Sequence, residues 1–506
     1  MTRPAIGSAQ ERGGRASADT LVIVGAGHVG GRAALALREA GWSGRVLLIG
    51  DETDPPYERP PLSKSVLMGE PFAATLATAA QFADAGVDWL AGRRVVAIDR
   101  AAAEIALDDG KRLAYHGLLL ATGGRARRLD VPGADLPGVL TLRTLADARA
   151  LAPRIAPGQR LLVIGGGFIG LEVAASARAR GAEVAVLEAA PRLLGRAVPA
   201  TIAARVQALH ESRGVLVRIG VPPVAFEARD GALHVRLADG SVLLADTIVV
   251  GIGIVPNIEL AEQCGLACAN GIVVDGHLRT SDPLICAAGD VASFPSALSG
   301  RALRLESWHN AEDQARVAAA NMAGGEAIVG AVPWFWSDQY DHQLQIAGDP
   351  SLGTQRATRA LDAQAHIDFH LDAAGRIVGV AGYGPVGALA QVLARVHAGL
   401  LAVVQVDVVR THRLRVGGHV LAVLDLDEAG HALPGANDMP QPCRPRRHSW
   451  GYERRLPADS ASRQTRTRAG VVQAARWAGV AYQSAAKKWQ VVPASTNRCQ
   501  AKCAYL

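Results

Sequence analysis

The sequence predicts an α/β protein that contains two Rossmann-type domains. The chain has 506 residues and is 49% apolar, which is enough for about three domains that each bury a core. A glycine-rich turn joins an apolar strand to an alanine-rich helix close to the N-terminus. A turn of the same kind, between a strand and a helix of the same kind, follows residue 160.

The first turn lies in the segment LVIVGAGHVGGRAALALREAG. Gly25 permits the tight turn, Gly27 lets a pyrophosphate approach the backbone, and Gly30 lets the helix pack closely against the strand. The positive end of the helix dipole then faces the diphosphate. The next strand, VLLIGDE, ends in Asp51 and Glu52, where a carboxylate can accept hydrogen bonds from ribose hydroxyls.

The second turn lies in RLLVIGGGFIGLEVAASARARGAEVAVLEAAPR and supplies Gly165, Gly167 and Gly170. Glu188 ends the following strand, and an acid there repels a 2′-phosphate, which favours NADH over NADPH. One such turn could be a loop without function. Two copies, each with its strand, helix and acid, predict two bound dinucleotides.

Two later segments, DTIVVGIGIVPN (246–257) and TSDPLICAAGDVA (280–292), have the pattern of short buried strands. The second segment would place Asp290 at the end of a strand, beside backbone N–H groups that are free for a polar ligand. An ordinary strand-to-helix turn explains this pattern equally well.

Cysteine usage argues against a secreted disulfide framework and against a metal centre. The chain has six cysteines, of which Cys264 is the first. Cys264 and Cys268 lie four residues apart without a nearby histidine or a second cysteine pair, and a metal site needs more ligands than this. We therefore expect structural cysteines and no bound metal.

Neither the N-terminal segment nor the longest uncharged run predicts membrane insertion. Residues 1–20 contain arginines but no hydrophobic signal region, so we expect a disordered N-terminal extension. The longest uncharged run, 377–394, contains four glycines and Pro385, which argues against a membrane span. We expect a soluble, cytoplasmic protein.

The last 64 residues differ in composition from the rest of the chain. The net charge is +6, and residues 443–506 hold thirteen Lys and Arg against two Asp and Glu. Low hydrophobic periodicity predicts disorder over much of this tail. Its charge alone would suit nucleic acid, but no binding module is recognisable, so we expect no nucleic-acid partner. The abrupt change favours an appended or out-of-frame end.

Several motifs together resemble one family, and they occur in that family's order from about residue 20 to about residue 400. They are ERPPLSK (58–64), LLLATGG (118–124), LRTLADA (142–148), GGGFIGLEVAA, VVGIGIVPN, AAGDVA, ESWHNA (306–311) and PWFWSDQYDHQLQIAG (333–348). The chain resembles the FAD-dependent, NADH-oxidising ferredoxin reductases that serve bacterial aromatic-ring dioxygenases, relatives of putidaredoxin and rubredoxin reductases.

The resemblance implies a glutathione-reductase-like fold with a small α+β C-terminal domain. The expected divisions are the N-terminal extension 1–20, a discontinuous FAD-binding domain 21–125 and 246–325, an NAD-binding domain 126–245, a C-terminal reductase domain 326–405, and a basic, partly disordered tail 406–506.

The resemblance also assigns roles to single residues. Prolines in YERPPLSK hold the chain extended and deliver Lys64 to the flavin ring, where Glu172 is its expected ion-pair partner. A solvated lysine after a proline turn is the alternative. Trp336 is expected between the flavin and an incoming ferredoxin, although a tryptophan of the core would give the same pattern.

The other implied contacts concern the two cofactors, FAD and NAD(H). They assign Arg59 and Arg143 to FAD, Asp290 to its ribityl chain, Arg196 to the NAD phosphates or ribose, Gly253 to the space for nicotinamide, and Trp308 to the start of a helix that faces the pyrimidine end of the flavin.

The implied activity is electron transfer from NADH through FAD to a small iron–sulfur ferredoxin, which indirectly serves a ring-hydroxylating oxygenase. The lack of cysteines before Cys264 excludes a dithiol relay in the first domain and disfavours relatives that use one cysteine beside the flavin. Two alternatives stay open: electron transfer to quinone or oxygen, and an apoptosis-inducing-factor-like protein whose partner contacts depend on its redox state.

Overall fold

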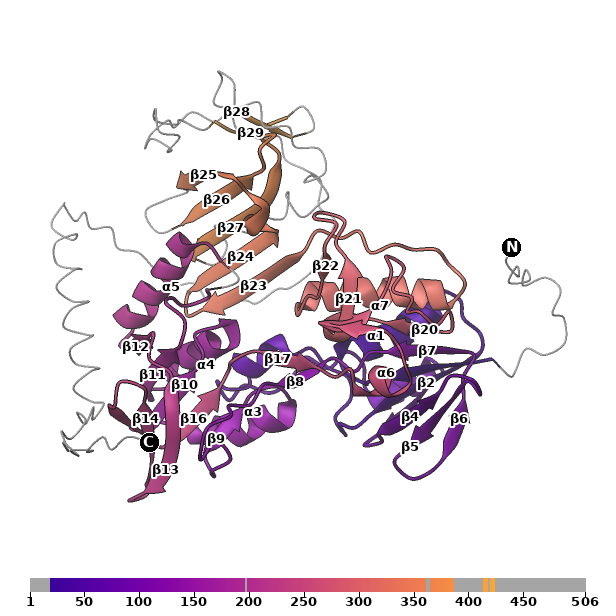
Figure 1. Ribbon diagram of the computed structural model, residues 1–506, viewed down its shortest axis with the longest axis horizontal. Coiled ribbons are helices and arrows are strands. Elements are labelled where there is room, and N and C mark those ends of the chain that lie inside the picture. The colour runs from indigo at the N-terminus through magenta and orange to yellow at the C-terminus, as the bar shows by residue number, and fades with distance from the viewer. Residues whose placement is uncertain (1–18, 196–197, 361–364, 386–412, 417–418, 424–506) are drawn as a thin grey trace, which may run out of the picture.

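Two α/β domains lie side by side, and an antiparallel sheet lies beside the second of them (Figure 1). The computed structural model describes residues 19–195, 198–360, 365–385, 413–416 and 419–423. Most of the predicted N-terminal extension and of the basic tail lies outside these residues.

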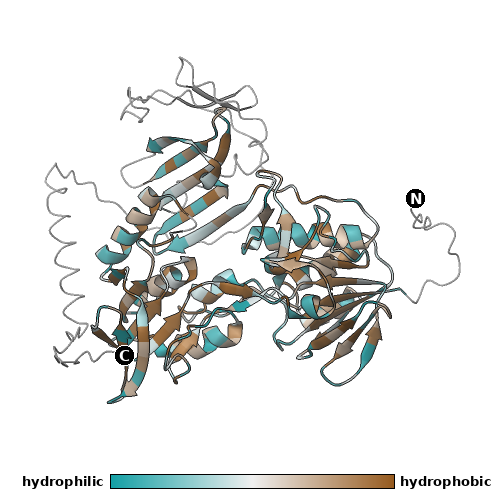
Figure 2. Ribbon diagram, viewed as in Figure 1, coloured by the Kyte–Doolittle hydropathy of each residue, from teal (hydrophilic) through white to brown (hydrophobic). Residues whose placement is uncertain are grey.

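The first domain is built on a parallel five-stranded sheet in the order β20-β7-β1-β2-β3. Its strands are β1 (Thr20–Val24), β2 (Arg45–Gly50), β3 (Val87–Ala91), β7 (Gly117–Leu120) and β20 (Ile285–Ala287). They are almost continuously apolar, as strands buried on both faces must be, and Figure 2 shows them mostly brown. The helices α1 (His28–Glu39) and α7 (Trp308–Met322) pack against each other.

The second domain repeats this design in the order β12-β11-β10-β16-β9, again with parallel strands. The strands are β9 (Val139–Thr141), β10 (Arg160–Ile164), β11 (Glu183–Glu188), β12 (Leu216–Ile219) and β16 (Thr247–Val250). Its helices are α3 (Leu145–Leu151), α4 (Phe168–Ala179) and α5 (Ala200–Ser212). Because β16 pairs with β10, this sheet extends past residue 245, where we expected the first domain to resume.

In each domain a three-stranded antiparallel sheet is inserted between two strands of the parallel sheet, between β3 and β7 in the first domain and between β12 and β16 in the second. These sheets are β4 (Val95–Asp99), β5 (Glu104–Leu107) and β6 (Arg112–Ala114), and β13 (Pro223–Arg229), β14 (Ala232–Leu237) and β15 (Val242–Ala245). The antiparallel pair β8 (Gly124–Ala126) and β17 (Ile254–Pro256) joins the two domains.

Shorter elements complete the first domain. They are the 3-10 turn η1 (Pro60–Ser63), the helices α2 (Ala79–Asp84) and α6 (Glu259–Gln263), and a small sheet of β18 (Cys268–Ala269), β19 (Gly271–Val273), β21 (Ala292–Pro295) and β22 (Ala302–Leu303).

The described part of the C-terminal domain is an antiparallel sheet in the order β23-β24-β27-β26-β25. Its strands are β23 (Trp334–Gln339), β24 (His342–Gly348), β25 (Gln355–Ala360), β26 (His366–Leu371) and β27 (Ile377–Pro385). Residues 386–405 of the expected domain lie outside the described residues. Within the tail, β28 (Arg413–Val416) pairs with β29 (His419–Val423). None of the described helices is long and apolar enough to cross a membrane.

Candidate functional site

Both glycine turns open into one cleft of about 1360 Å³. The lining includes the end of β10, the turns that follow β1 and β10, and residues of the C-terminal sheet. Ligands bound at the two turns can therefore meet inside a single cavity.

Each turn requires a glycine at its first position. Gly25 has φ +108° and Gly165 has φ +107°, values that side-chain-bearing residues rarely adopt. An added Cβ would also lie 2.2 Å from the carbonyl oxygen of Ala121 at the first turn and 2.3 Å from that of Gly251 at the second. The backbone at each turn is thus held against the neighbouring strand.

The remaining fingerprint glycines serve packing and access. A Cβ on Gly30 or Gly170 would lie 1.8 or 2.1 Å from the carbonyl oxygen of the first glycine of its own turn, so helix and strand touch there. Gly27 and Gly167 line the cleft, and added Cβ atoms there would have their nearest neighbours at 3.7 and 4.0 Å. These two positions leave the backbone open to a ligand, as a bound pyrophosphate requires.

Glu188 ends β11 at the rim of the second turn. Its carboxylate accepts hydrogen bonds from the backbone N–H groups of Gly166 and Ala190, both at 2.8 Å. The residue that corresponds to Glu188 in the first domain is Gly50. The carbonyl of Leu187 accepts a hydrogen bond from the N–H of Gly165, the carbonyl of Ile49 accepts one from the N–H of Gly25, and Glu188 and Gly50 are the next residues. A Cβ on Gly50 would lie 2.4 Å from the Cβ of Ala26, so the first domain can carry its acids only farther along.

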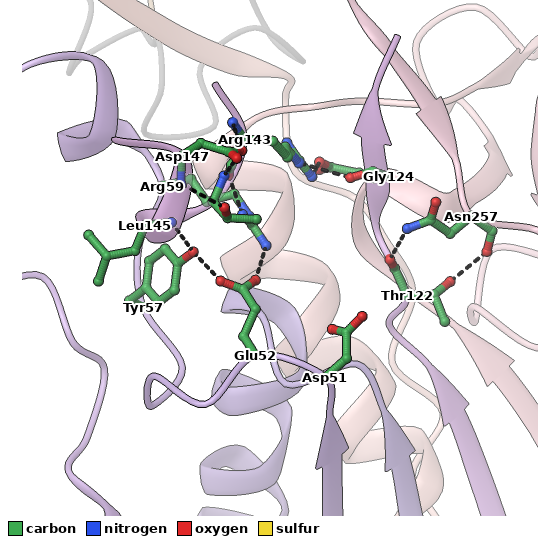
Figure 3. Close-up of polar contacts among 12 residues, drawn as sticks. Asp51, Glu52, Tyr57, Arg59, Thr122, Gly124, Arg143, Leu145, Asp147 and Asn257 are labelled. Atoms are coloured by element: carbon green, nitrogen blue, oxygen red, sulfur yellow. Dashed lines mark hydrogen bonds and ion pairs between the residues drawn. The ribbon is translucent and has the colours of Figure 1, made fainter. Parts of the chain in front are cut away.

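Those later acids, Asp51 and Glu52, behave differently (Figure 3). Glu52 accepts a hydrogen bond from the Tyr57 hydroxyl at 2.5 Å and pairs with Arg59 at 3.1 Å. Burial raises the pKa of Tyr57, so its hydroxyl stays a donor. Asp51 is 63% exposed and pairs with Arg94 at 3.3 Å. Asp51 is therefore the freer carboxylate, and the sequence did not single out Tyr57 as the anchor of Glu52.

Arg59, Arg143 and Asp290 form one connected group on the cleft wall. Arg59 donates to the backbone carbonyl of Arg143, and its other terminal nitrogen lies closest to the space above Gly27. Arg143 pairs with Asp290 at 2.7 Å. It also donates to the carbonyl of Gly124 at 2.9 Å (Figure 3). The three residues assigned to FAD by resemblance thus lie next to the first turn.

Lys64 and Glu172 form an ion pair, with 3.0 Å between Nζ and Oε2. Lys64 follows η1, whose first two residues are prolines, and its side chain is 24% exposed. Glu172 lies on α4 and is 4% exposed, so this carboxylate depends on its protein partners for solvation. The role of the pair beside a flavin ring stays a prediction.

The sequence did not single out the other partners of this pair. Glu172 accepts hydrogen bonds from the hydroxyls of Ser63 at 2.5 Å and Ser337 at 2.7 Å, and Asp338 lies 3.7 Å from Lys64. The polar letters SDQ inside the aromatic segment WFWSDQ were the available signal. Three domains therefore meet at Glu172.

Aromatic rings line the side of the cleft next to β23. Trp308 lies edge-on to Trp336, with 6.0 Å between ring centroids, and Trp336 stacks on Trp334 at 5.0 Å. Phe168 and Phe335 form a second pair at 4.4 Å. The indole Nε1 of Trp308 is buried without a hydrogen-bond partner in the described part of the chain.

Gly253 and Arg196 were both assigned to NAD(H) by resemblance, and the structure describes only the first of them. Gly253 lines the cleft with φ +98°, and an added Cβ would meet nothing within 4 Å, so this position faces open space and its role toward nicotinamide stays a prediction. Arg196 lies outside the described residues.

Cysteines and metal-binding groups do not contribute to the cleft as far as the chain is described. Cys264, Cys268 and Cys286 are free, and none of them lines the cavity. Burial raises the pKa of the Cys286 thiol to about 12. Within the same residues, no group of three or more His, Cys, Asp and Glu side chains could hold a metal ion.

The cleft fits two dinucleotides, since the backbone is open to it at Gly27 and Gly167 and an acid lies near each turn. The pyridine nucleotide-disulphide oxidoreductase family matches residues 19–315, and the reductase C-terminal family matches residues 334–399. FAD and NAD(H) are therefore the cofactors.

Individual relatives agree with these matches. Rhodocoxin reductase of Rhodococcus erythropolis is 46% identical over 332 residues, or 65% of this chain and 78% of the relative. The ferredoxin–NAD(+) reductase component of an anthranilate 1,2-dioxygenase system from Burkholderia cepacia is 44% identical over 370 residues, or 72% and 91%. The covalent complex of putidaredoxin reductase with putidaredoxin matches with a TM-score of 0.71 and 38% identity over 76% of this chain and 94% of that one. The chain therefore belongs to the pyridine nucleotide-disulphide oxidoreductase family and groups there with the ferredoxin reductases.

Proposed function

We propose that this protein transfers electrons from NADH, through FAD held at the first turn, to a small iron–sulfur ferredoxin. The observation that carries the proposal is the single cleft shared by both turns, with Lys64 and Glu172 between them and Trp336 at its edge. Relatives named as ferredoxin reductases support the choice of acceptor. An oxygenase that attacks an aromatic ring is the proposed final consumer of the electrons.

Bound FAD supplies the ability to accept a hydride and to release electrons singly. The protein's contribution is to bind and orient. Arg59 and Arg143 neutralise phosphate charge beside the first turn, and Asp290, held by Arg143, offers its second carboxylate oxygen to a hydroxyl. At the second turn, the carboxylate of Glu188 accepts hydrogen bonds from the ribose hydroxyls of NADH.

Lys64 and Glu172 define the place where the two cofactors meet. The Nζ atom of Lys64 lies at the cleft, 3.0 Å from Glu172 and 3.7 Å from Asp338. The low exposure of Glu172 limits access of water to this point. No described side chain needs to act as an acid or base in the hydride step.

Trp336 is the proposed contact for the ferredoxin. It lines the cleft, and Trp334 stacks on its outer side, so the two rings lead away from the cavity. The proposal gives Trp336 a role after flavin reduction, and the alternative is a tryptophan that only packs the sheet.

The test measures cytochrome c reduction by NADH with and without an added ferredoxin from a ring-hydroxylating dioxygenase system. The proposal predicts fast reduction that depends on the ferredoxin. Equal rates without ferredoxin would favour quinone or oxygen as acceptor. A reduced protein that holds NAD(H) and passes electrons to none of these acceptors would favour the redox-controlled binding protein.

A further inference from the structure

A stripe of α4 faces alternate residues of β23. Phe168, Glu172 and Ser176 recur every fourth residue and share one face of the helix. On the strand, Phe335, Ser337 and Gln339 recur every second residue and share one face of the sheet. Phe168 contacts Phe335, and Glu172 contacts Ser337. The second domain and the C-terminal sheet thus meet through a matched apolar pair and a matched polar pair.

The polar contact continues inward from Ser337. Gln339 Nε2 lies 2.9 Å from Ser337 Oγ, and Gln339 Oε1 lies 2.9 Å from Nε2 of His210 on α5. The Tyr340 hydroxyl lies 3.3 Å from Nδ1 of the same histidine. Glu172, Ser337, Gln339 and His210 are each at most 4% exposed. Buried polar groups of this kind need every donor and acceptor satisfied.

The direction of each hydrogen bond follows from the carboxylate of Glu172, which pairs with Lys64 and accepts from Ser337. The hydroxyl of Ser337 must therefore donate to Glu172, and its oxygen is left to accept from the Gln339 amide N–H. The amide oxygen of Gln339 then faces His210, which must carry its proton on Nε2 and accept from Tyr340 at Nδ1. Four successive donors point toward Glu172.

His210 suits this arrangement because it is neutral. Burial lowers its pKa from 6.5 to about 4, against a smaller opposing effect of the hydrogen bond to Gln339. A neutral imidazole has one donor and one acceptor, as the chain of hydrogen bonds requires. The amide of Gln339 is thereby fixed, and Gln339 in turn fixes the hydroxyl of Ser337.

We propose that Ser337 is a positioning residue for the Lys64–Glu172 pair, and that the buried Gln339–His210 contact sets the direction of its hydroxyl. The inference rests on the proposed function, because it gives the C-terminal sheet control over the geometry at the meeting point of the cofactors. Ser63 and Lys64 both contact Oε2 of Glu172, whereas Ser337 contacts Oε1. Ser337 therefore determines how the carboxylate of Glu172 is rotated, and this rotation sets the position of the oxygen that pairs with Lys64.

Substitution of Ser337 tests this role, with a matched control at the opposite edge of the same sheet. Thr358 on β25 also donates its hydroxyl to a buried carboxylate, that of Asp368, at 2.6 Å. The variants Ser337→Ala and Thr358→Val each remove one such bond. Ser337→Cys keeps a side chain of similar size with a weak donor.

The readouts are the limiting rate of flavin reduction by NADH, the dissociation constant of NADH, and the flavin midpoint potential. We expect Ser337→Ala to slow the limiting rate about tenfold, to shift the potential and to leave the NADH affinity unchanged, because a misplaced group near the reacting atoms costs rate. Ser337→Cys should lie between Ser337→Ala and the wild type. Thr358→Val should leave the rate and the potential at wild-type values.

A double-mutant cycle with Glu172→Gln separates positioning from a general loss of stability. If Ser337 acts through Glu172, Ser337→Ala has no further effect on rate or potential in the Glu172→Gln background. Additive effects, or equal losses in Ser337→Ala and Thr358→Val, would overturn the inference. If Glu172→Gln itself left the rate and the potential unchanged, the proposed role of the ion pair would fail. If Glu172→Gln slowed flavin reduction but Ser337→Ala did not, only the inference about Ser337 would fail.

Discussion

Acid should destabilise the fold through His210, and His210→Gln should remove that part of the pH dependence. His210 is fully buried on α5, where it contacts Gln339 and Tyr340. Burial lowers its pKa to about 4, so the folded protein resists protonation at a pH where an exposed histidine is already charged.

The magnitude follows from the difference between the folded and unfolded pKa values. Unfolded His210 takes up a proton near its ordinary pKa of 6.5, whereas the folded form does so near 4. Between these values the unfolded state binds more protons, so the free energy of unfolding falls as the pH falls from 6.5 toward 4. A difference of this size corresponds to about 3 kcal/mol for complete passage through the window.

Urea unfolding of the wild type and of His210→Gln at pH 7.5 and pH 4.5 measures this effect. Carboxylates and the other histidines titrate in both proteins, so the difference between the two pH dependences isolates His210. We expect the wild type to lose about 2–3 kcal/mol more than the variant over this interval. Parallel losses in the two proteins would refute the assignment of a buried, neutral His210.

Three further predictions concern the cleft. Gly165→Ala should abolish NADH binding while FAD content stays normal, because its Cβ would lie 2.3 Å from a backbone oxygen. The control is Gly231→Ala, at φ +76° with nothing within 4 Å, and equal NADH titrations of the two variants would contradict the prediction. Glu188→Ala should lower the ratio of NADH to NADPH affinity by about tenfold or more, and an unchanged ratio in binding titrations would exclude Glu188 as the selecting acid. Trp336→Phe should reduce the rate of ferredoxin reduction more than the rate of NADH oxidation with ferricyanide, whereas equal losses would indicate a packing role.

The two dinucleotide turns were predictable because their chemistry is local. A glycine at φ above +100°, a strand before it and a helix after it are all encoded within about thirty residues. Lys64 and Glu172 are far apart in the sequence, and only the resemblance to a family linked them. The structure brings them to 3.0 Å.

The features that the sequence did not predict depend on contacts between domains. In the sequence, nothing distinguishes Ser337 and His210 from other strand and helix residues. Their hydrogen bonds form only when the C-terminal sheet packs on α4 and α5. The boundary near residue 245 differed for a similar reason, because the pairing of β16 with β10 is a long-range contact. The position of the first-domain acids depends on the close approach of Gly50 to Ala26.

An anaerobic titration of the purified protein with NADH, and separately with NADPH, tests the central claim of two dinucleotides in one cleft. The account predicts a flavin absorbance spectrum that bleaches with about one equivalent of NADH, and with NADPH only at much higher concentration. A colourless protein that does not take up added FAD, or a flavin that NADH does not reduce, would contradict it.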